Sequence, residues 1–200
     1  MKTKPVVILI AGPNGSGKTT ITEQLRKHAW MDGCVYVNPD IIAEEKFGGW
    51  NLPEASLKAA QEAERIRRDC FAKRKSVAFE SVFSAPDKLR FVRAAVKAGY
   101  FVRLFFICTE SPEINASRIL GRRLEGGHDV PLEKIYSRFA KSIAQCAVAI
   151  RWVDRAYVYD NSIENEAPAL LFRSKNGQLV KRYAGPANWA KPILDRLRKK

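Results

Sequence analysis

The chain has 200 residues, of which 46% are hydrophobic and 28% are charged, as in an ordinary globular protein. Its apolar runs fall short of the roughly 20 residues that a transmembrane helix needs, so we expect no membrane-spanning helix. The net charge of +14 favours polyanionic partners such as nucleotides, phosphorylated metabolites or nucleic acid. A solvated basic surface, including the basic segment 196–200, accounts for the same excess equally well.

Apolar runs alternate with helical periodicities along the chain. The run Val6–Ala11 is apolar on both faces, and we interpret it as a buried strand rather than as a signal peptide, because it leads directly into a glycine-rich segment. Further strands are predicted at 34–38, 76–80, 100–108 and 156–159. Helices are predicted at 18–28, 41–47, 53–73, 86–98, 111–125, 131–152 and 189–200.

The segment 170–180 has the pattern of a β-hairpin, with an Asn-Gly turn at Asn176 and Gly177. Strands that alternate with helices, without internal repeats, indicate an α/β fold. We therefore expect a parallel sheet of about five strands with helices on both faces, followed by a C-terminal β-hairpin and helix. The whole chain, 1–200, is expected to form a single domain.

The cysteines do not suggest a metal site or a disulfide framework. The chain has four of them, widely spread and without a C-x-x-C pair: Cys34, Cys70, Cys108 and Cys146. We expect reduced thiols and a cytoplasmic protein.

The segment 12–19 has the spacing G-x-x-x-x-G-K-[ST] between a predicted strand and a predicted helix. The glycines let successive backbone N–H groups turn towards phosphates, and the N-terminus of the following helix favours negative charge. Lys18 is expected to reach the β- and γ-phosphates of ATP, and the Thr19 hydroxyl to ligate Mg²⁺. The residues expected to bind the nucleotide are Gly12, Pro13, Asn14, Gly15, Ser16, Gly17, Lys18, Thr19 and Thr20.

The phosphate loop alone does not identify the reaction. The sequence lacks the guanine-recognition pattern N-K-x-D, and the predicted strand at 100–108 ends on Ile107 and Cys108 rather than on an aspartate. Together with the small size, these features favour a compact phosphotransferase (kinase).

Two acidic residues follow predicted strands, Asp40 after the second and Glu80 at the end of the third. Ligands of open parallel sheets lie outside the carboxyl ends of the strands, so both carboxylates should face the phosphate loop. One could orient or deprotonate an acceptor hydroxyl while the other binds the acceptor. The alternatives are a helix cap for Asp40 and a structural acid for Glu80.

Arginines cluster around the predicted helix 111–125. Arg118 and Arg122 are four residues apart and share one helix face, while Arg138 lies on the next helix. A helical lid around 111–140 could bring them over the phosphates of ATP and stabilise charge in the transition state. A solvated basic face is the alternative.

The chain resembles the zeta-toxin family of P-loop kinases, which phosphorylate UDP-N-acetylglucosamine, and in particular its compact bacterial members. The resemblance rests on six pieces in order: 12–19, Asn38-Pro39-Asp40, Glu80-Ser81, Arg118-x-x-x-Arg122 with Gly126–Pro131, Arg138, and Tyr159–Ser162.

The resemblance implies an ATP- and Mg²⁺-dependent kinase that transfers the γ-phosphate to a hydroxyl of a nucleotide sugar, and an antitoxin protein as a partner. It implies Asp40 as general base, with Glu80 and Ser81 contacting the acceptor. Arg118, Arg122 and Arg138 would clamp phosphates, and Asn161 would form part of the adenine-side wall.

Two other functions stay open. The charge of +14 would suit a nucleic-acid end kinase, although the sequence has no evident stripe of aromatic and basic residues for stacking bases. A non-catalytic ATP-binding switch, or a toxin–antitoxin module of that kind, would bind ATP without transferring phosphate. The sequence does not predict a role for the hairpin at 170–180.

Overall fold

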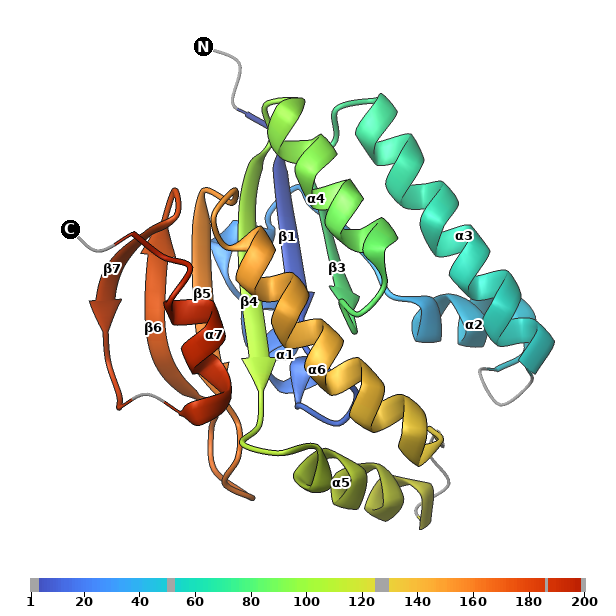
Figure 1. Ribbon diagram of the computed structural model, residues 1–200. Helices are drawn as coiled ribbons and strands as arrows, with labels where there is room; N and C mark the ends of the chain where they lie inside the picture. The colour runs from blue at the N-terminus through green and yellow to red at the C-terminus, as the bar shows by residue number, and fades with distance from the viewer. Residues whose placement is uncertain (1–3, 50–52, 125–129, 186, 199–200) are drawn as a thin grey trace.

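The computed structural model describes residues 4–49, 53–124, 130–185 and 187–198. Its centre is a seven-stranded sheet with the strand order β2-β3-β1-β4-β5-β6-β7 (Figure 1). The first five strands in this order are parallel, and β6 and β7 are antiparallel additions at one edge. The strands are β1 Val6–Ala11, β2 Val35–Val37, β3 Val77–Ser81, β4 Phe101–Cys108, β5 Arg155–Asp160, β6 Ala169–Lys175 and β7 Gln178–Arg182.

Helices cover both faces of this sheet, as the sequence predicts. The larger apolar core packs β1, β3, β4 and β5 against α2, α3, α4, α6 and α7, and a smaller core packs α1 on the opposite face. Helix α5 lies beyond the carboxyl ends of the strands, beside α6 (Figure 1). The helices are α1 Lys18–Arg26, α2 Pro39–Phe47, α3 Pro53–Ala72, α4 Pro86–Lys97, α5 Pro112–Leu124, α6 Leu132–Ala149 and α7 Lys191–Leu194, with the 3₁₀ turns η1 Ala29–Met31 and η2 Asn188–Ala190.

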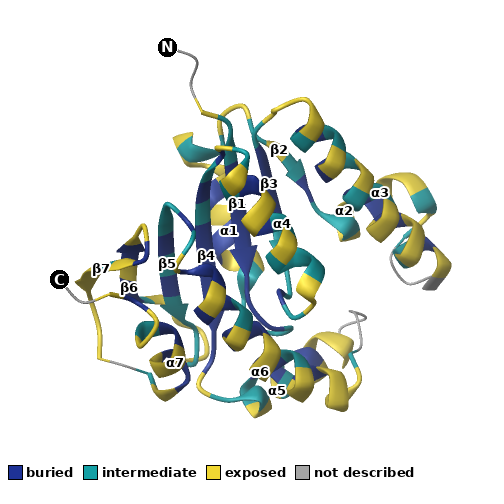
Figure 2. Cartoon of the chain, turned by 45° about the horizontal axis from the view of Figure 1, so that its top comes forward, coloured by how far each residue is buried: buried dark blue, intermediate teal, exposed yellow. Residues whose placement is uncertain are grey.

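The two central strands are buried on both faces, which explains their continuous apolar sequences. Residues 7–11 of β1 have no exposed surface, and β4 is buried from Leu104 to Cys108 (Figure 2). The sheet therefore forms a rigid support whose carboxyl edge carries the loops that follow β1, β3 and β4.

The C-terminal hairpin forms as predicted, and the closing helix is shorter than predicted. Asn176 and Gly177 have φ of 49° and 71°, the conformation of the two-residue turn that Asn-Gly sequences favour. A continuous helix over 189–200 was the wrong expectation, because α7 spans only Lys191–Leu194. The Arg198 N–H instead donates to the Gly177 carbonyl at 3.0 Å, which places residue 198 beside the start of β7.

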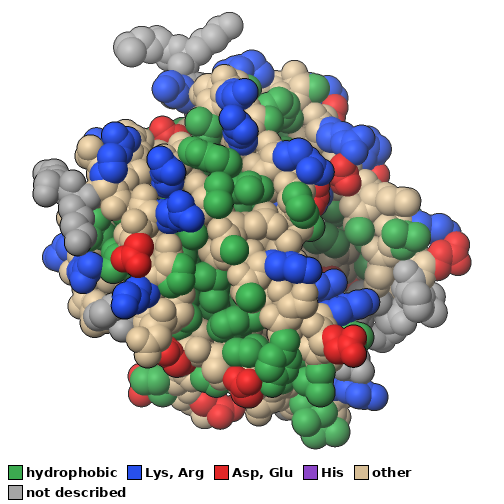
Figure 3. Space-filling model, viewed as in Figure 1, with side chains coloured by type: hydrophobic (Ala, Val, Ile, Leu, Met, Phe, Trp, Pro, Cys, Tyr) green, Lys and Arg blue, Asp and Glu red, His purple; other side chains and the backbone are tan. Residues whose placement is uncertain are grey.

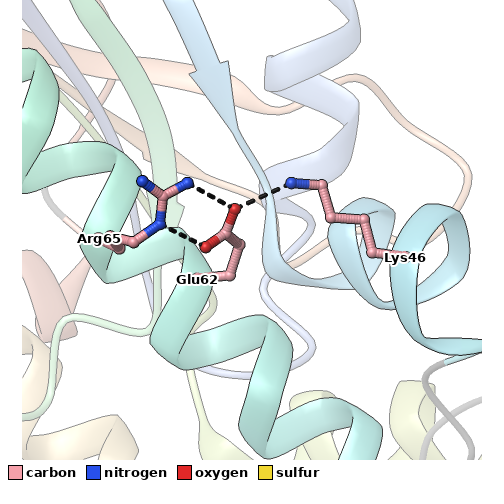
Figure 4. Close-up of polar contacts among 3 residues, drawn as sticks. All are labelled: Lys46, Glu62 and Arg65. Carbon is pink, nitrogen blue, oxygen red and sulfur yellow. Dashed lines mark hydrogen bonds and ion pairs between the residues drawn. The ribbon is translucent and has the colours of Figure 1, made fainter.

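Helices α2 and α3 are held together by a three-residue ion-pair cluster. The Glu62 carboxylate on α3 accepts hydrogen bonds from Arg65 at 2.6 Å and from Lys46 of α2 at 2.9 Å (Figure 4). The Arg65 and Lys46 hydrogen bonds lower the pKa of Glu62 to about 2. The cluster orients the helix that forms the outer wall of the cleft described below.

None of the helices in the described part of the chain is long and apolar enough to cross a bilayer. All four cysteines are free thiols, and Cys70, Cys108 and Cys146 are buried.

Candidate active site

The phosphate loop connects β1 to α1 and is closely packed against its neighbours. A Cβ atom at Gly12 would lie 2.0 Å from the Ile107 carbonyl oxygen, and one at Gly15 would lie 2.6 Å from the Asn115 carbonyl oxygen of α5. Gly15 and Gly17 have φ of 77° and 86°, a conformation that glycine adopts without strain. The spacing of the glycines therefore reflects steric requirements of this loop, and the loop fits a phosphate chain.

Lys18 folds back over the loop. Its Nζ atom donates to the Gly12 carbonyl at 3.0 Å and to the Pro13 carbonyl at 2.9 Å. Burial lowers the pKa of Lys18 to about 8, an effect that the charge of Arg122 adds to and the charges of Glu80 and Asp40 oppose. The ammonium group is thus held in a poorly solvated position that a phosphate could stabilise.

The hydroxyls of the loop differ in their surroundings. Thr19 and Thr20 are exposed and line the cleft, while Ser16 is fully buried, and its Oγ atom has no hydrogen-bond partner among the described residues. The described residues contain no cluster of three or more His, Cys, Asp or Glu side chains suited to a metal. A Mg²⁺ ion held by one hydroxyl, phosphates and water would still fit this site.

Asp40 does not cap α2, contrary to the alternative considered from the sequence. Asn38 is the cap residue, because its side chain accepts a hydrogen bond from the Asp40 N–H at 2.9 Å. Asp40 lies in the first turn, is exposed, and lines the cleft with its carboxylate free of hydrogen bonds to described residues. This leaves the carboxylate available to a ligand.

Glu80, in contrast, is held by a hydrogen-bond network. Its Oε1 atom accepts from the Thr22 hydroxyl at 2.7 Å and from the Tyr36 hydroxyl at 3.1 Å, and Asn38 donates to Tyr36 at 3.2 Å. Burial, together with the nearby Glu80 charge, raises the pKa of Tyr36 to about 12, so this hydroxyl stays protonated at neutral pH. Thr22 of α1 and Tyr36 of β2 thus orient the Glu80 side chain at the end of β3.

Ser81 supports the backbone of the site. Its carbonyl accepts the Gly12 N–H at 3.2 Å, and its hydroxyl accepts the Phe83 N–H at 3.0 Å. Ser81 also lines the cleft.

The three candidate arginines have different environments. Arg138 donates to the Asn14 side chain of the phosphate loop at 3.2 Å, and Arg118 donates to the backbone carbonyl of Asn161 at 2.8 Å. Arg122 is exposed and lines the cleft, and its charge contributes to the lowered pKa of Lys18. The segment 126–129, which belongs to the sequence pattern that follows Arg122, lies outside the described residues.

Asn161 lies against the phosphate loop, next to the start of α1. Its Nδ2 atom donates to the Ser16 carbonyl at 3.0 Å and occupies the space that a Cβ at Gly17 would need, at 2.1 Å. Its backbone N–H bonds to the Cys108 carbonyl at 2.8 Å. The loop after β5 is therefore fixed beside the loop after β1.

One open cleft of about 1530 Å³ is lined by Lys18, Thr19, Asp40, Glu80, Ser81, Asn161 and the three arginines. The cleft extends from the phosphate loop to α3 and the start of α4, where Gln61, Glu64, Arg67, Ser84 and Lys88 line it. Arg67 is 7% exposed and forms no ion pair with a described carboxylate, although its guanidinium stacks 5.2 Å from the centre of the Phe79 ring. The far half of the cleft thus contains a buried cation.

Sequence reasoning missed Thr22, Tyr36 and Arg67. Tyr36 lies two residues before Asn38 on a strand that ends at the site, a signal that could have identified it. Thr22 and Arg67 sit within helical patterns. Only the packing of α1 and α3 on the sheet brings Thr22 to Glu80 and Arg67 to the cleft.

Several solved structures share this fold. A chain of the AvrRxo1-ORF1:-ORF2 complex with ATP aligns with a TM-score of 0.67 and 18% identity over 98% of this chain and 64% of that one. A chain from the PezAT chromosomal toxin–antitoxin system of Streptococcus pneumoniae gives 0.55 and 19%, over 80% and 69%. A putative kinase from Chloroflexus aurantiacus J-10-fl gives 0.51 and 22%, over 68% and 80%.

This chain is thus shorter than the AvrRxo1 relative and spans less than two thirds of its length. No curated protein matches it in sequence. A model of the zeta toxin family, however, matches residues 1–175, which include the phosphate loop, both acidic residues and all three arginines. The chain therefore belongs to the zeta toxin family.

Proposed function

We propose that the protein is a kinase that transfers the γ-phosphate of ATP to a hydroxyl of a small molecule. The observation that carries the proposal is that the phosphate loop, the free carboxylate of Asp40 and the oriented carboxylate of Glu80 line a single cleft. Family membership supports the same chemistry.

On the donor side, the loop N–H groups and Lys18 bind the phosphates, and Asn161 borders the adenine. The Thr19 hydroxyl, phosphate oxygens and water would hold Mg²⁺, which neutralises phosphate charge and aligns the transferred group. Arg122 and Arg138 stabilise negative charge on the γ-phosphate, with 111–140 acting as a lid on a single domain. Arg118 positions the loop that carries Asn161.

On the acceptor side, the hydroxyl oxygen attacks the γ-phosphorus, and the bond between this phosphorus and the bridging oxygen breaks to release ADP. Asp40 takes the proton of the attacking hydroxyl, and Glu80 fixes the acceptor by hydrogen bonding. Arg67 favours an acceptor with an anionic group, which a nucleotide sugar such as UDP-N-acetylglucosamine provides through its diphosphate.

The proposal is tested by incubating the protein with γ-labelled ATP, Mg²⁺ and UDP-N-acetylglucosamine, followed by mass spectrometry. We expect a phosphorylated sugar nucleotide and ADP. Asp40→Asn should abolish transfer but leave ATP binding within about threefold, and Glu45→Gln, an exposed acid on the same helix, should change neither.

Two results would reject parts of this proposal. An Asp40→Asn protein with normal turnover would remove the general base. Binding of ATP without phosphorylation of UDP-N-acetylglucosamine or of any metabolite in a cell extract would favour the nucleotide-dependent switch.

By its family, the protein should also act as a toxin restrained by an antitoxin. Expression of the chain alone in a bacterial host should slow growth, and expression of Lys18→Met should not. Equal growth of both strains would argue against toxicity while leaving the kinase assay unaffected.

A further inference from the structure

The face of the sheet opposite α6 and α7 is open over its C-terminal strands. Ala156 and Val158 of β5 point into the larger core, so Arg155, Tyr157 and Tyr159 point to the other side. On that side α1 packs over β1, and Trp30 of η1 reaches only as far as Tyr157, at 5.7 Å between ring centres.

Basic residues occupy this open surface in register across four strands. Arg103 of β4, whose guanidinium carbon lies 4.0 Å from the centre of the Trp30 ring at the border of this surface, pairs with Arg155 of β5. Arg155 in turn pairs with Lys175 of β6. In the next row of the same face, Tyr157 pairs with Arg173, which pairs with Lys181 of β7. We call the surface formed by Arg103, Arg155, Arg173, Lys175 and Lys181, with Tyr157 and Tyr183, the basic sheet face.

Like charges opposite one another on neighbouring strands destabilise a sheet. The basic sheet face nevertheless has no acidic residue at these strand positions, and Arg173, Lys175 and Lys181 are exposed. The helix-covered face differs, because its basic side chains lie among acidic and apolar ones (Figure 3). These cations form no ion pair with any carboxylate in the described part of the chain, and such a concentration of positive charge suits a polyanion.

Aromatic rings lie between these cations. Tyr157 stacks on Phe105 with ring centres 4.8 Å apart and planes 8° from parallel. Tyr183 is 44% exposed, with the Lys181 Nζ atom 4.9 Å and the Arg173 guanidinium carbon 5.9 Å from its ring centre. The Tyr157 ring is thus held by Phe105 and Trp30, and two cations lie beside the Tyr183 ring.

We propose that the basic sheet face binds single-stranded nucleic acid, with its phosphates on the basic side chains and its bases on the exposed parts of Tyr157 and Tyr183. Stacking on an aromatic ring needs a base with a free face, which a single strand offers and an intact duplex does not. An acidic protein segment would match the charge but would leave the rings without a partner.

This surface lies on a face of the sheet, whereas the cleft lies at its carboxyl edge. It therefore constitutes a second site, whose function does not depend on the proposed kinase reaction. It also explains why the sequence has no visible aromatic–basic stripe: its residues come from four separate strands.

Fluorescence anisotropy with a labelled twelve-nucleotide oligouridylate, over a range of salt concentrations, tests the proposal. Five cations predict a slope of log K against log salt of about −3.5, since each phosphate contact with a single strand contributes about −0.7. The double variant Arg173→Ala/Lys181→Ala should bind at least about tenfold more weakly and lose about 1.4 from the slope. Tyr183→Leu should weaken binding about fivefold or more without changing the slope.

The matched control is Arg90→Ala/Lys141→Ala, which removes the same charge from exposed positions on α4 and α6 of the opposite face. This control should change the affinity for the oligouridylate less than twofold. The proposal is overturned if the oligonucleotide does not bind, if both double variants weaken binding equally, or if a duplex or polyglutamate competes as well as the single strand does. Phosphoryl transfer should be the same in all these variants. If the protein proves to have no kinase activity, the measurements of oligonucleotide binding still test this second site.

Discussion

The Arg138 Nη1 atom lies 3.2 Å from the Asn14 Oδ1 atom, so that one hydrogen bond joins helix α6 to the phosphate loop. The two residues are 124 positions apart in sequence. The Arg138 guanidinium group therefore couples the position of α6 to that of the phosphate loop.

Replacing Arg138 should impair catalysis by the proposed kinase. Arg138→Ala removes both the contact with Asn14 and a positive charge, and kcat/KM should fall about 100-fold, as when one transition-state donor is removed. Arg138→Lys should retain part of the activity, and Lys141→Ala, an exposed residue on the same helix, should retain all of it. Steady-state kinetics with ATP as the varied substrate measures this, and an unchanged kcat/KM in Arg138→Ala would contradict the role.

The network around Glu80 should affect the acceptor rather than ATP. Tyr36→Phe removes a hydrogen bond to a charged group, worth about 1.5–3 kcal/mol, and we expect the KM of the acceptor to rise about tenfold. The Kd of ATP should stay constant. Thr22→Val and the double variant complete a thermodynamic cycle, and a coupling energy near zero would show that the two hydroxyls do not act together on Glu80.

ATP binding should depend on pH through Lys18, whose pKa is about 8. Phosphates stabilise the ammonium group, so its pKa rises on binding. Below pH 8 the free protein already carries the proton and the affinity is constant; above pH 8 the proton must be taken up and the affinity falls, up to tenfold per pH unit. Calorimetry in buffers of different ionisation enthalpy should detect this uptake. A Kd that is constant between pH 7 and 9.5 would be incompatible with the shift.

Gly17 should be required for its close contact with Asn161. Gly17→Ala would place a Cβ 2.1 Å from the Asn161 amide nitrogen, which should displace that side chain and weaken ATP binding about tenfold or more. Gly33→Ala is the matched control, since its φ of 72° imposes similar strain but nothing lies within 4 Å. Both variants should lose stability. If titration gives the same ATP affinity for Gly17→Ala and Gly33→Ala, the steric contact with Asn161 is unimportant.

Arg67 should select anionic acceptors. Arg67→Met keeps most of the packing on Phe79 but removes the charge, and the KM of a nucleotide sugar should rise at least about tenfold, with the KM of ATP unchanged. Lys58→Met, which affects an exposed residue of the same helix, serves as the control. If the variant and the wild type discriminate equally between UDP-N-acetylglucosamine and uncharged N-acetylglucosamine, Arg67 does not select for charge.

Local sequence patterns predicted most of the fold. The phosphate loop could be recognised because its glycines, Lys18 and Thr19 follow a short local spacing, and the hairpin because Asn176 and Gly177 define a particular turn. The order of strands and helices followed from periodicity. The C-terminal helix was overestimated because periodicity contains no information on the pairing of Arg198 with the start of β7.

Only part of the site could be predicted from the sequence, because several of its contacts join residues far apart in the chain. Asp40 and Glu80 could be placed at the carboxyl edge from the positions of their strands, but the cap at Asn38 depends on backbone geometry. The contact between Thr22 and Glu80 spans 58 positions, and the Arg138–Asn14 contact spans 124. Such contacts depend on how helices pack on the sheet, which a single sequence does not encode in any short pattern.

The family match ends at residue 175, the last residue of β6, so β7 and α7 lie beyond the matched segment. Without β7, the backbone N–H and C=O groups of β6 would form a free sheet edge able to pair with the same edge of another molecule. In the protein, β7 covers that edge, carries the charged residues Lys181 and Arg182, and is itself paired at its start with Arg198. The last strand thus also protects the molecule against self-association, and shortened forms that end near residue 175 should aggregate.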